Sequence, residues 1–236
     1  MERIQMSPNG PEVSRLVFGF WRAKDDPEGT SPDRFLRKIH TCLDHGITTM
    51  DHADIYGLYE NEELFGAALK QEPALRDKLE IITKCGISVP SEAKSYARLP
   101  HYEATADNIV ACAERSLEKL GIDHIDVLLI HRPDWLTAAD ETAEGLTRLL
   151  DAGKIRFAGV SNYTIHQFEL LNDRLEGKLV TNQVEVHLRE MTTLYDGTLS
   201  QCERLRICPM AWSPMGGGKL FADDPAAVRI REACAE

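Results

Sequence analysis

The sequence predicts an α/β fold of the TIM (β/α)8 barrel type with an N-terminal β-hairpin. Short β-branched apolar runs alternate along the chain with longer segments of helical period, which is typical of parallel strands joined by right-handed crossovers. The strands read as continuous apolar runs, most clearly at Asp126–Ile130 (DVLLI), as expected for a sheet covered on both faces. No GxGxxG turn follows the first strand, where the chain reads Gly19-Phe20-Trp21-Arg22. A doubly wound dinucleotide-binding sheet is therefore the second choice.

Seven parallel strands are predicted after the hairpin. The hairpin begins at Arg3–Met6 and turns through Pro8–Pro11, a sequence of turn-forming residues. The strands are expected at Leu16–Gly19, Ile47–Asp51, Leu79–Lys84, Ile125–His131, Arg156–Val160, Leu179–Gln183 and Cys208–Trp212. A TIM barrel has eight, and a seven-stranded barrel would leave two edges unpaired. We therefore expect residues 1–236 to form a single barrel domain that is incomplete at its C-terminus, with the eighth strand–helix unit missing from this chain.

Helices are predicted between the strands. The first shows the clearest signals, because Ser31 is a preferred cap and Pro32 suits the first turn. Its apolar residues Phe35, Ile39 and Leu43 recur every four residues and define one buried face. The other helices are expected around Glu62–Leu69, Thr105–Leu120, Ala138–Ala152, Thr164–Leu175 and Leu199–Leu205, with a last one from about Pro225.

The composition is that of an ordinary globular protein with an acidic surface. Hydrophobic residues make up 43% and charged residues 28%, and the net charge of −11 disfavours nucleic acid as a partner. No apolar run reaches the roughly 18 residues of a membrane span, and the N-terminus lacks the apolar segment of a secretory signal. The six cysteines form no CxxC pair, as is usual in a reducing compartment. We expect a cytoplasmic protein without a membrane partner, and its oligomeric state is open.

Polar or aromatic side chains lie at the ends of six predicted strands. In a parallel barrel these ends meet at one face, which carries the active site. Tyr56 lies in the loop after the second strand. The strand-end residues are Asp51, Lys84, His131, Asn162, Gln183 and Trp212. Their coincidence at one face favours a function over six unrelated structural roles.

The chemistry of these groups suits proton transfer to a carbonyl oxygen. A free tyrosine has a pKa near ~10, and a nearby lysine ammonium is expected to lower that of Tyr56 into a more useful range. Asp51 would keep Lys84 charged, and His131 could position the carbonyl group. Taken singly, each residue also has a structural interpretation. Asp51 and Lys84 could be a rim ion pair, and His131 a buried core histidine.

The groups at the later strand ends suit a nicotinamide. Asn162 and Gln183 offer amide donors and acceptors, and Trp212 offers a flat face for stacking. Asn162 could instead cap the following helix, and Trp212 could fill the core. Gly216–Gly218 could be an ordinary turn or a loop that approaches a phosphate group.

Several stretches resemble the aldo-keto reductase superfamily and follow its order along nearly the whole chain. Asp51–Gly57 (DHADIYG) resembles the signature around the catalytic Asp and Tyr, and Gly153–Tyr163 resembles the fifth unit, one of the most specific motifs. The chain is most similar to a bacterial branch of predicted oxidoreductases that opens with a SPxGPE-like segment, here Ser7–Glu12. The other similar stretches are Ile82–Lys84, Leu128–His131, Asn182–Glu185 and Ala211–Gly218.

The resemblance implies an NADPH-dependent barrel without a metal. It implies the catalytic residues Asp51, Tyr56, Lys84 and His131. It implies the cofactor-binding residues Gly19, Ser161, Asn162, Gln183, Trp212, Ser213, Met215 and Gly216. Among these, Ser161, Asn162 and Gln183 would hold the carboxamide, and Trp212 would stack on the ring where the family usually has Tyr. Ser213, Met215 and Gly216 would lie along the pyrophosphate. The family's eighth strand and following basic loop, which bind the 2′-phosphate, are not found in this sequence, so NADH is not excluded.

We therefore expect an NAD(P)H-dependent oxidoreductase that reduces small aldehydes or ketones to alcohols, with Tyr56 as the general acid. One alternative is a non-catalytic cofactor-binding sensor subunit, which the four intact tetrad positions disfavour. Another is a metal-dependent hydrolase on the same barrel using His52, Asp54, His131 and His187, although no HxH pair ends the first strand. Specificity would come from the loops at Trp21, at Tyr59, at Gly86–His101 and after Trp135.

Overall fold

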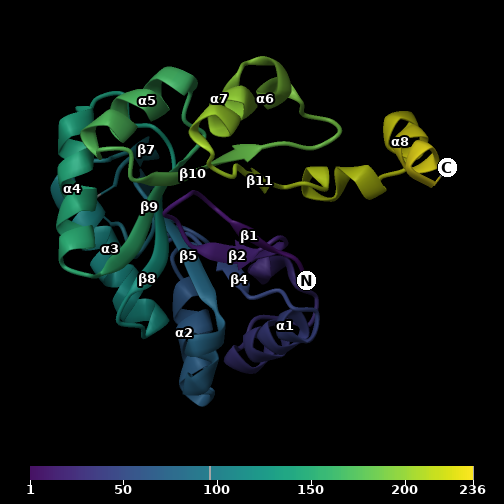
Figure 1. Ribbon diagram of the computed structural model, residues 1–236. Helices are drawn as coiled ribbons and strands as arrows, with labels where there is room; N and C mark the ends of the chain where they lie inside the picture. The colour runs from purple at the N-terminus through teal and green to yellow at the C-terminus, as the bar shows by residue number, and fades with distance from the viewer. Residues whose placement is uncertain (96, 236) are drawn as a thin grey trace.

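The computed structural model describes residues 1–95 and 97–235, in which seven parallel strands form one curled sheet (Figure 1). The strand order β11-β10-β9-β8-β5-β4-β3 follows the chain, so each crossover joins spatial neighbours. This singly wound order is that of a barrel and confirms the predicted α/β class. The strands are β3 (Val17–Gly19), β4 (Thr49–Asp51), β5 (Glu80–Cys85), β8 (Ile125–Ile130), β9 (Ile155–Ser161), β10 (Leu179–Glu185) and β11 (Met210–Trp212).

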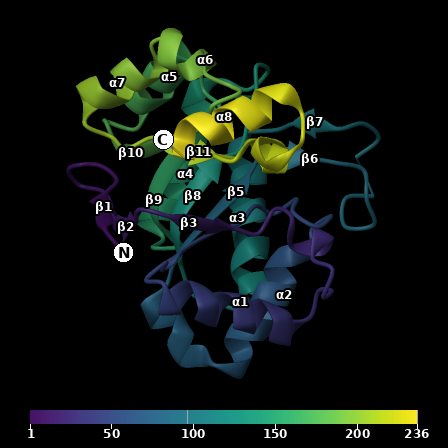
Figure 2. The same ribbon diagram turned by 90° about the vertical axis from the view of Figure 1, so that its right-hand side faces the viewer.

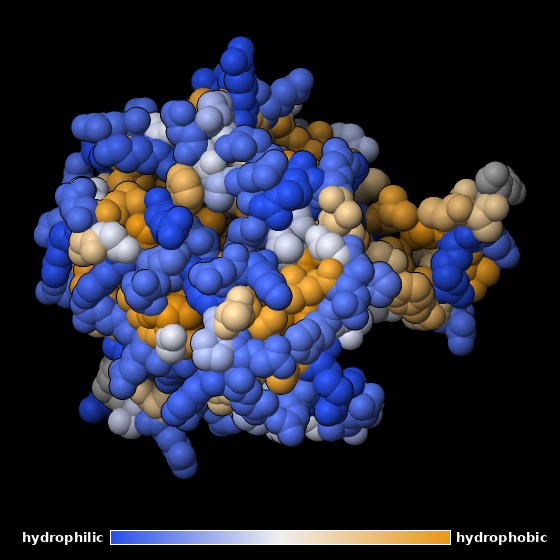
Figure 3. All heavy atoms as spheres, turned by 60° about the horizontal axis from the view of Figure 1, so that its bottom comes forward, coloured by the Kyte–Doolittle hydropathy of each residue, from blue (hydrophilic) through white to orange (hydrophobic). Residues whose placement is uncertain are grey.

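Helices cover the outer face of the sheet (Figures 1 and 2). They are α1 (Pro32–Asp44), α2 (Asn61–Gln71), α3 (Ala106–Leu120), α4 (Ala139–Asp151), α5 (Ile165–Arg174), α6 (Thr192–Tyr195) and α7 (Thr198–Leu205). Short 3-10 turns lie at Ala23–Asp25, Pro73–Lys78 and Gly216–Phe221. The last of them leads to α8 (Pro225–Ala235), which projects from the body on an arm that carries apolar side chains (Figures 1 and 3).

Side-chain caps explain where the predicted helices begin. The Ser31 hydroxyl accepts a hydrogen bond from the Arg34 N–H at 3.1 Å, and Pro32 occupies the first turn of α1. Thr105 caps α3 in the same way, and Thr164 forms a capping box with Gln167 at α5. Each such cap contributes about 1 kcal/mol. The three helices begin within one residue of the predicted positions.

The N-terminal hairpin closes the floor of the barrel. Its strands β1 (Arg3–Gln5) and β2 (Glu12–Ser14) pair antiparallel, as predicted. The buried side chains of Met6 and Val13 pack with Ile82 and Leu129 inside the sheet. Arg3 attaches the hairpin to the barrel by donating to Thr48 Oγ1 at 2.9 Å and to Glu80 Oε1 at 2.8 Å. The interior above this floor opens toward the carboxyl ends of the strands.

Besides the one-turn helix α6 and the 3-10 turns, the structure adds a small hairpin in the loop after β5 that the sequence did not indicate. Its strands β6 (Ile87–Ser88) and β7 (His101–Tyr102) have two residues each, too few for a visible alternation. Among the described residues, β3 and β11 end the ladder and do not pair with each other. That an eighth strand–helix unit is missing from this chain stays a prediction. In the part of the chain described, no helix is long and apolar enough to cross a membrane.

Candidate active site

Lys84 lies at the centre of the candidate site, fully buried inside the barrel. It follows Ile82 on the inward face of β5, because side chains alternate along a strand. Its ammonium donates to Asp51 Oδ2 at 2.7 Å, to the His52 carbonyl at 2.7 Å and to the Tyr56 hydroxyl at 3.0 Å. These bonds use the three donors of the ammonium. Residues from β4, its following loop and β5 are thus joined through one charge.

The pKa of Tyr56 differs from the expectation, whereas Lys84 stays charged as expected. Burial lowers the pKa of Lys84, but Asp51 and Tyr56 raise it, and the net shift is upward. Burial also raises the pKa of Tyr56, and it outweighs the opposing effect of the Lys84 ammonium. The expected net lowering of the Tyr56 pKa by Lys84 is therefore wrong for the protein alone. For this phenol, the cost of desolvating the charged form exceeds the stabilisation that the adjacent cation provides.

His131 and Trp21 flank the Tyr56 ring. The His131 ring lies edge-on to it, with centroids 5.9 Å apart, and the Trp21 ring lies nearly parallel at 6.3 Å. Burial lowers the pKa of His131 to about 2, assisted by the positive charges of Lys84 and Arg132, so its imidazole is neutral at physiological pH. Its Nδ1 atom is buried and has no hydrogen-bond partner among residues 1–95 and 97–235.

The residues predicted to hold a carboxamide form one chain of hydrogen bonds that reaches Asp51. The Trp212 indole Nε1 donates to Asn162 Oδ1 at 3.0 Å, and Asn162 Nδ2 donates to Ser161 Oγ at 2.7 Å. The Ser161 hydroxyl donates to the main-chain carbonyl of Gln183 at 2.9 Å. Gln183 Nε2 then donates to Asp51 Oδ1 at 2.9 Å. Strands β9, β10 and β11 are thereby connected to the Asp51–Lys84 pair.

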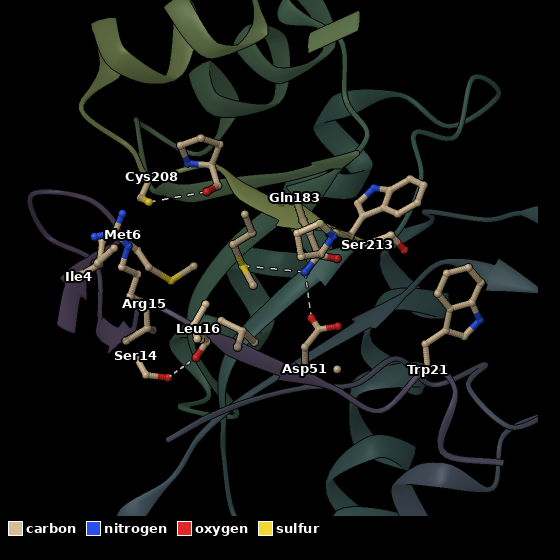
Figure 4. A pocket seen from close by; sticks show the side chains of 18 of the residues that line it. Ile4, Met6, Ser14, Arg15, Leu16, Trp21, Asp51, Gln183, Cys208 and Ser213 are labelled. Atoms are coloured by element: carbon tan, nitrogen blue, oxygen red, sulfur yellow. Dashed lines mark hydrogen bonds between the residues drawn. The ribbon is translucent and has the colours of Figure 1, made fainter. Parts of the chain in front are cut away.

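A cavity of about 520 Å³ opens beside this chain (Figure 4). Its polar end is formed by Asp51, Tyr56 and Gln183, and its other end by apolar residues of the hairpin and of the edge strands β3 and β11. Gly19, Trp212 and Ser213 also line it, whereas Met215 and Gly216 do not. Those two residues lie on the segment leading to the projecting arm. The structure therefore gathers all the predicted site residues except this pair.

The sequence did not indicate Arg132, whose positive charge opposes the rise that burial causes in the Tyr56 pKa and adds to the lowering that burial causes in the His131 pKa. Its guanidinium carbon lies 6.0 Å from the centroid of the Trp212 ring. Its position directly after His131, at the end of a barrel strand, was the available signal.

The residues of the metal alternative lie in separate surroundings. The His52 ring is enclosed between Phe20 and Phe65, with ring centroids 4.4 Å away in both cases. Asp54 is buried beside Glu62 and Lys94, while His187 Nε2 contacts Glu185 at 3.2 Å. No group of three potential ligands that could hold a metal ion occurs within residues 1–95 and 97–235. The geometry thus gives the hydrolase alternative no support.

Comparison with known proteins decides the family. Residues 15–230 match the model of the Aldo/keto reductase family. The chain belongs to this family. It is therefore an oxidoreductase of the carbonyl-reducing kind, as predicted.

Individual relatives of this aldo/keto reductase agree with that result. The chain is 49% identical over 222 residues to a 6-dehydroglucose reductase of Agrobacterium fabrum, covering 94% of this chain and 74% of the relative. It is 48% identical over 224 residues to the oxidoreductase YdhF of Escherichia coli, covering 95% and 74%. Among solved structures, the glycerol dehydrogenase AKR11B4 of Gluconobacter oxydans is similar with a TM-score of 0.76 and 31% identity, covering 89% of this chain and 62% of that chain. The thermostable aldo-keto reductase Tm1743, solved with epalrestat, shares the fold at a TM-score of 0.81 and 24% identity, covering 100% and 80%.

Proposed function

We propose that this protein reduces aldehydes or ketones to alcohols with NAD(P)H, and that Tyr56 is the general acid. The observation that carries the proposal is the Tyr56 hydroxyl, which lines the cavity and bonds to Lys84 at 3.0 Å. Asp51 holds Lys84 from the other side at 2.7 Å. A proton donor, a fixed cation and the counter-charge of that cation are therefore joined by hydrogen bonds at the cavity.

The proton would pass from the Tyr56 hydroxyl to the substrate oxygen as negative charge develops there. Burial, which raises the pKa of Tyr56, keeps the phenol protonated at neutral pH, so the donor is in its active form. The phenolate left after transfer would be stabilised by Lys84 and by Arg132, both of which favour the charged form. His131 is neutral and edge-on to Tyr56, so its single N–H could orient the substrate oxygen without competing as an acid.

The residues present fit a nicotinamide dinucleotide. The Trp212 ring and Gln183 line the cavity, and hydrogen bonds link Trp212 through the Asn162 and Ser161 side chains to the main-chain carbonyl of Gln183. A Cβ atom added at Gly19 would meet nothing within 4 Å, which leaves open space for a ligand against the backbone. The cofactor would supply the hydride. We propose that Ser213, Met215 and Gly216 bind its pyrophosphate, with NADPH preferred and NADH as the alternative.

The substrate proposed is a small carbonyl compound, with an aldehyde on a polyhydroxylated carbon chain as the first candidate. This choice follows the name of the 49% identical relative, a 6-dehydroglucose reductase. A cytoplasmic location and a single-domain barrel are part of the same proposal.

The test is the loss of reduced-cofactor absorbance with a panel of aldehydes and ketones, including a hexose oxidised to the aldehyde at carbon 6. Turnover that is lost in Tyr56→Phe supports the proposal. Tight cofactor binding without turnover of any carbonyl compound would favour the non-catalytic sensor. Near-normal turnover by Tyr56→Phe would exclude Tyr56 as the acid.

A further inference from the structure

Gln183 links the Asp51–Lys84–Tyr56 group of the candidate site to the Ser161–Asn162–Trp212 group. Its Nε2 donates to Asp51 Oδ1, while Lys84 occupies Asp51 Oδ2. An ionised carboxylate only accepts hydrogen bonds, so the amide group of Gln183 must turn its NH2 toward Asp51. The second N–H of this group is directed at Met210 Sδ, 3.9 Å away. The amide orientation is therefore fixed by the protein before any ligand binds.

We propose that Gln183 is a positioning residue that couples a ligand amide in the cavity to the ionisation of Tyr56. With its NH2 group committed to Asp51, Gln183 offers Oε1 as an acceptor for an N–H donor of the ligand. The part of this inference that concerns the ligand rests on the proposed nicotinamide-dependent function. The part that concerns Tyr56 rests on Gln183, Asp51 and Lys84 alone.

The direction of the coupling follows from the charge on Asp51. This charge raises the pKa of Tyr56, because a phenolate forming nearby would be repelled. The Gln183 N–H draws some of the charge away from Asp51, and a ligand donor on Oε1 would polarise the amide and strengthen this effect. Loss of the Gln183 N–H should therefore raise the Tyr56 pKa, and ligand binding should lower it.

The first experiment uses the protein without cofactor, so its readout is independent of turnover. Gln183→Met keeps the side-chain volume but removes the donor to Asp51. Thr181→Val is the matched control, because Thr181 is buried on the same strand and its hydroxyl bonds to the Cys208 carbonyl at 2.8 Å, outside the chain that leads to Tyr56. The Tyr56 signal is followed by carbon-13 NMR of labelled tyrosine between about pH 8 and 12 and assigned with Tyr56→Phe.

The expected result is an upward shift of the Tyr56 pKa by about half a unit to one unit in Gln183→Met, with no shift in Thr181→Val. An unchanged Tyr56 pKa in a folded Gln183→Met protein, with folding checked by circular dichroism, would overturn the proposal. Equal shifts in both variants would also overturn it, because they would reflect a general disturbance of β10.

The second experiment tests the acceptor oxygen with two probes, oxidised NADP and its analogue that carries a carboxylate instead of the carboxamide. The wild-type protein should bind the carboxamide form about tenfold more tightly or better, because the carboxylate has no N–H for Gln183 Oε1. This preference should fall in Gln183→Met and persist in Thr181→Val. Equal affinity of the wild type for both probes would overturn the inference about the acceptor. Binding of neither probe would instead count against the proposed cofactor, and the titration of Tyr56 would still decide the link to Asp51.

Discussion

Replacing Lys84 with methionine should cost folding stability as well as catalysis. Methionine fills a similar volume, so the cost comes from the groups left behind. The Asp51 side chain is 12% exposed and would keep the Gln183 amide as a donor after losing its counter-charge. Removing one partner of a buried ion pair costs about 3–5 kcal/mol, and we expect a value in this range for the free energy of unfolding.

A double-mutant cycle isolates the interaction of the pair. Asp51→Asn alone leaves a buried ammonium without its counter-charge, whereas Asp51→Asn with Lys84→Met removes both charges. The double variant should be about as stable as the better single variant, which corresponds to a coupling energy of at least about 2 kcal/mol. The measurement is urea unfolding at neutral pH followed by circular dichroism.

The exposed pair Arg15–Glu2 provides the control. Its charged atoms lie 2.5 Å apart, compared with 2.7 Å for Lys84 and Asp51, but both side chains are more than 60% exposed. Its coupling energy should stay below about 1 kcal/mol. If the stability losses of Asp51→Asn and Lys84→Met add up to the loss of the double variant within about 0.5 kcal/mol, the two residues do not interact as a buried charged pair, and this description is refuted.

Three further predictions follow from buried groups. Tyr56→Phe should abolish turnover yet change cofactor affinity, measured by fluorescence quenching, by less than about threefold, since it removes one hydroxyl. Burial lowers the pKa of His52 to about 3, so below about pH 6.5 this residue binds a proton in the unfolded chain but not in the folded protein. The folding stability should therefore fall as the pH decreases, by about 2 kcal/mol at pH 5 for this residue. His52→Phe should remove that part of the loss, measured by urea unfolding. Burial raises the pKa of Asp54 to about 7, so the folded state holds the extra proton and stability is lost as pH rises from about 4 to 7. Asp54→Asn should therefore raise the unfolding midpoint near pH 8 and leave it nearly unchanged near pH 4, and an equal gain at both would contradict the buried carboxyl.

The sequence predicted the parallel strands well because most are short runs rich in apolar residues, and six of the seven have a polar or aromatic residue at or just after the carboxyl end. Lys84 illustrates this, since its place on the inward face of β5 follows from alternation with Ile82. The helix starts were predictable for a similar local reason, because Ser31, Thr105 and Thr164 cap their own first turns.

Features that depend on distant segments were not predictable. The bond from Gln183 to Asp51 joins residues 132 positions apart and requires the sheet to curl. The raised Tyr56 pKa depends on how fully the phenol is buried, which no local motif encodes. The β6–β7 hairpin was missed because two-residue strands in a loop leave no periodic pattern.

The hairpin that forms the barrel floor has a consequence for the order of assembly during synthesis. It precedes all seven strands of the sheet in the sequence, yet the Met6 carbonyl accepts a hydrogen bond from the Cys208 N–H, and Met6 packs beside Val180. The hairpin can therefore make its full set of contacts only after the chain has been synthesised as far as Cys208. Until then the apolar side chains of Met6 and Val13 lack part of their packing and stay more exposed to water for as long as translation of the later strands takes.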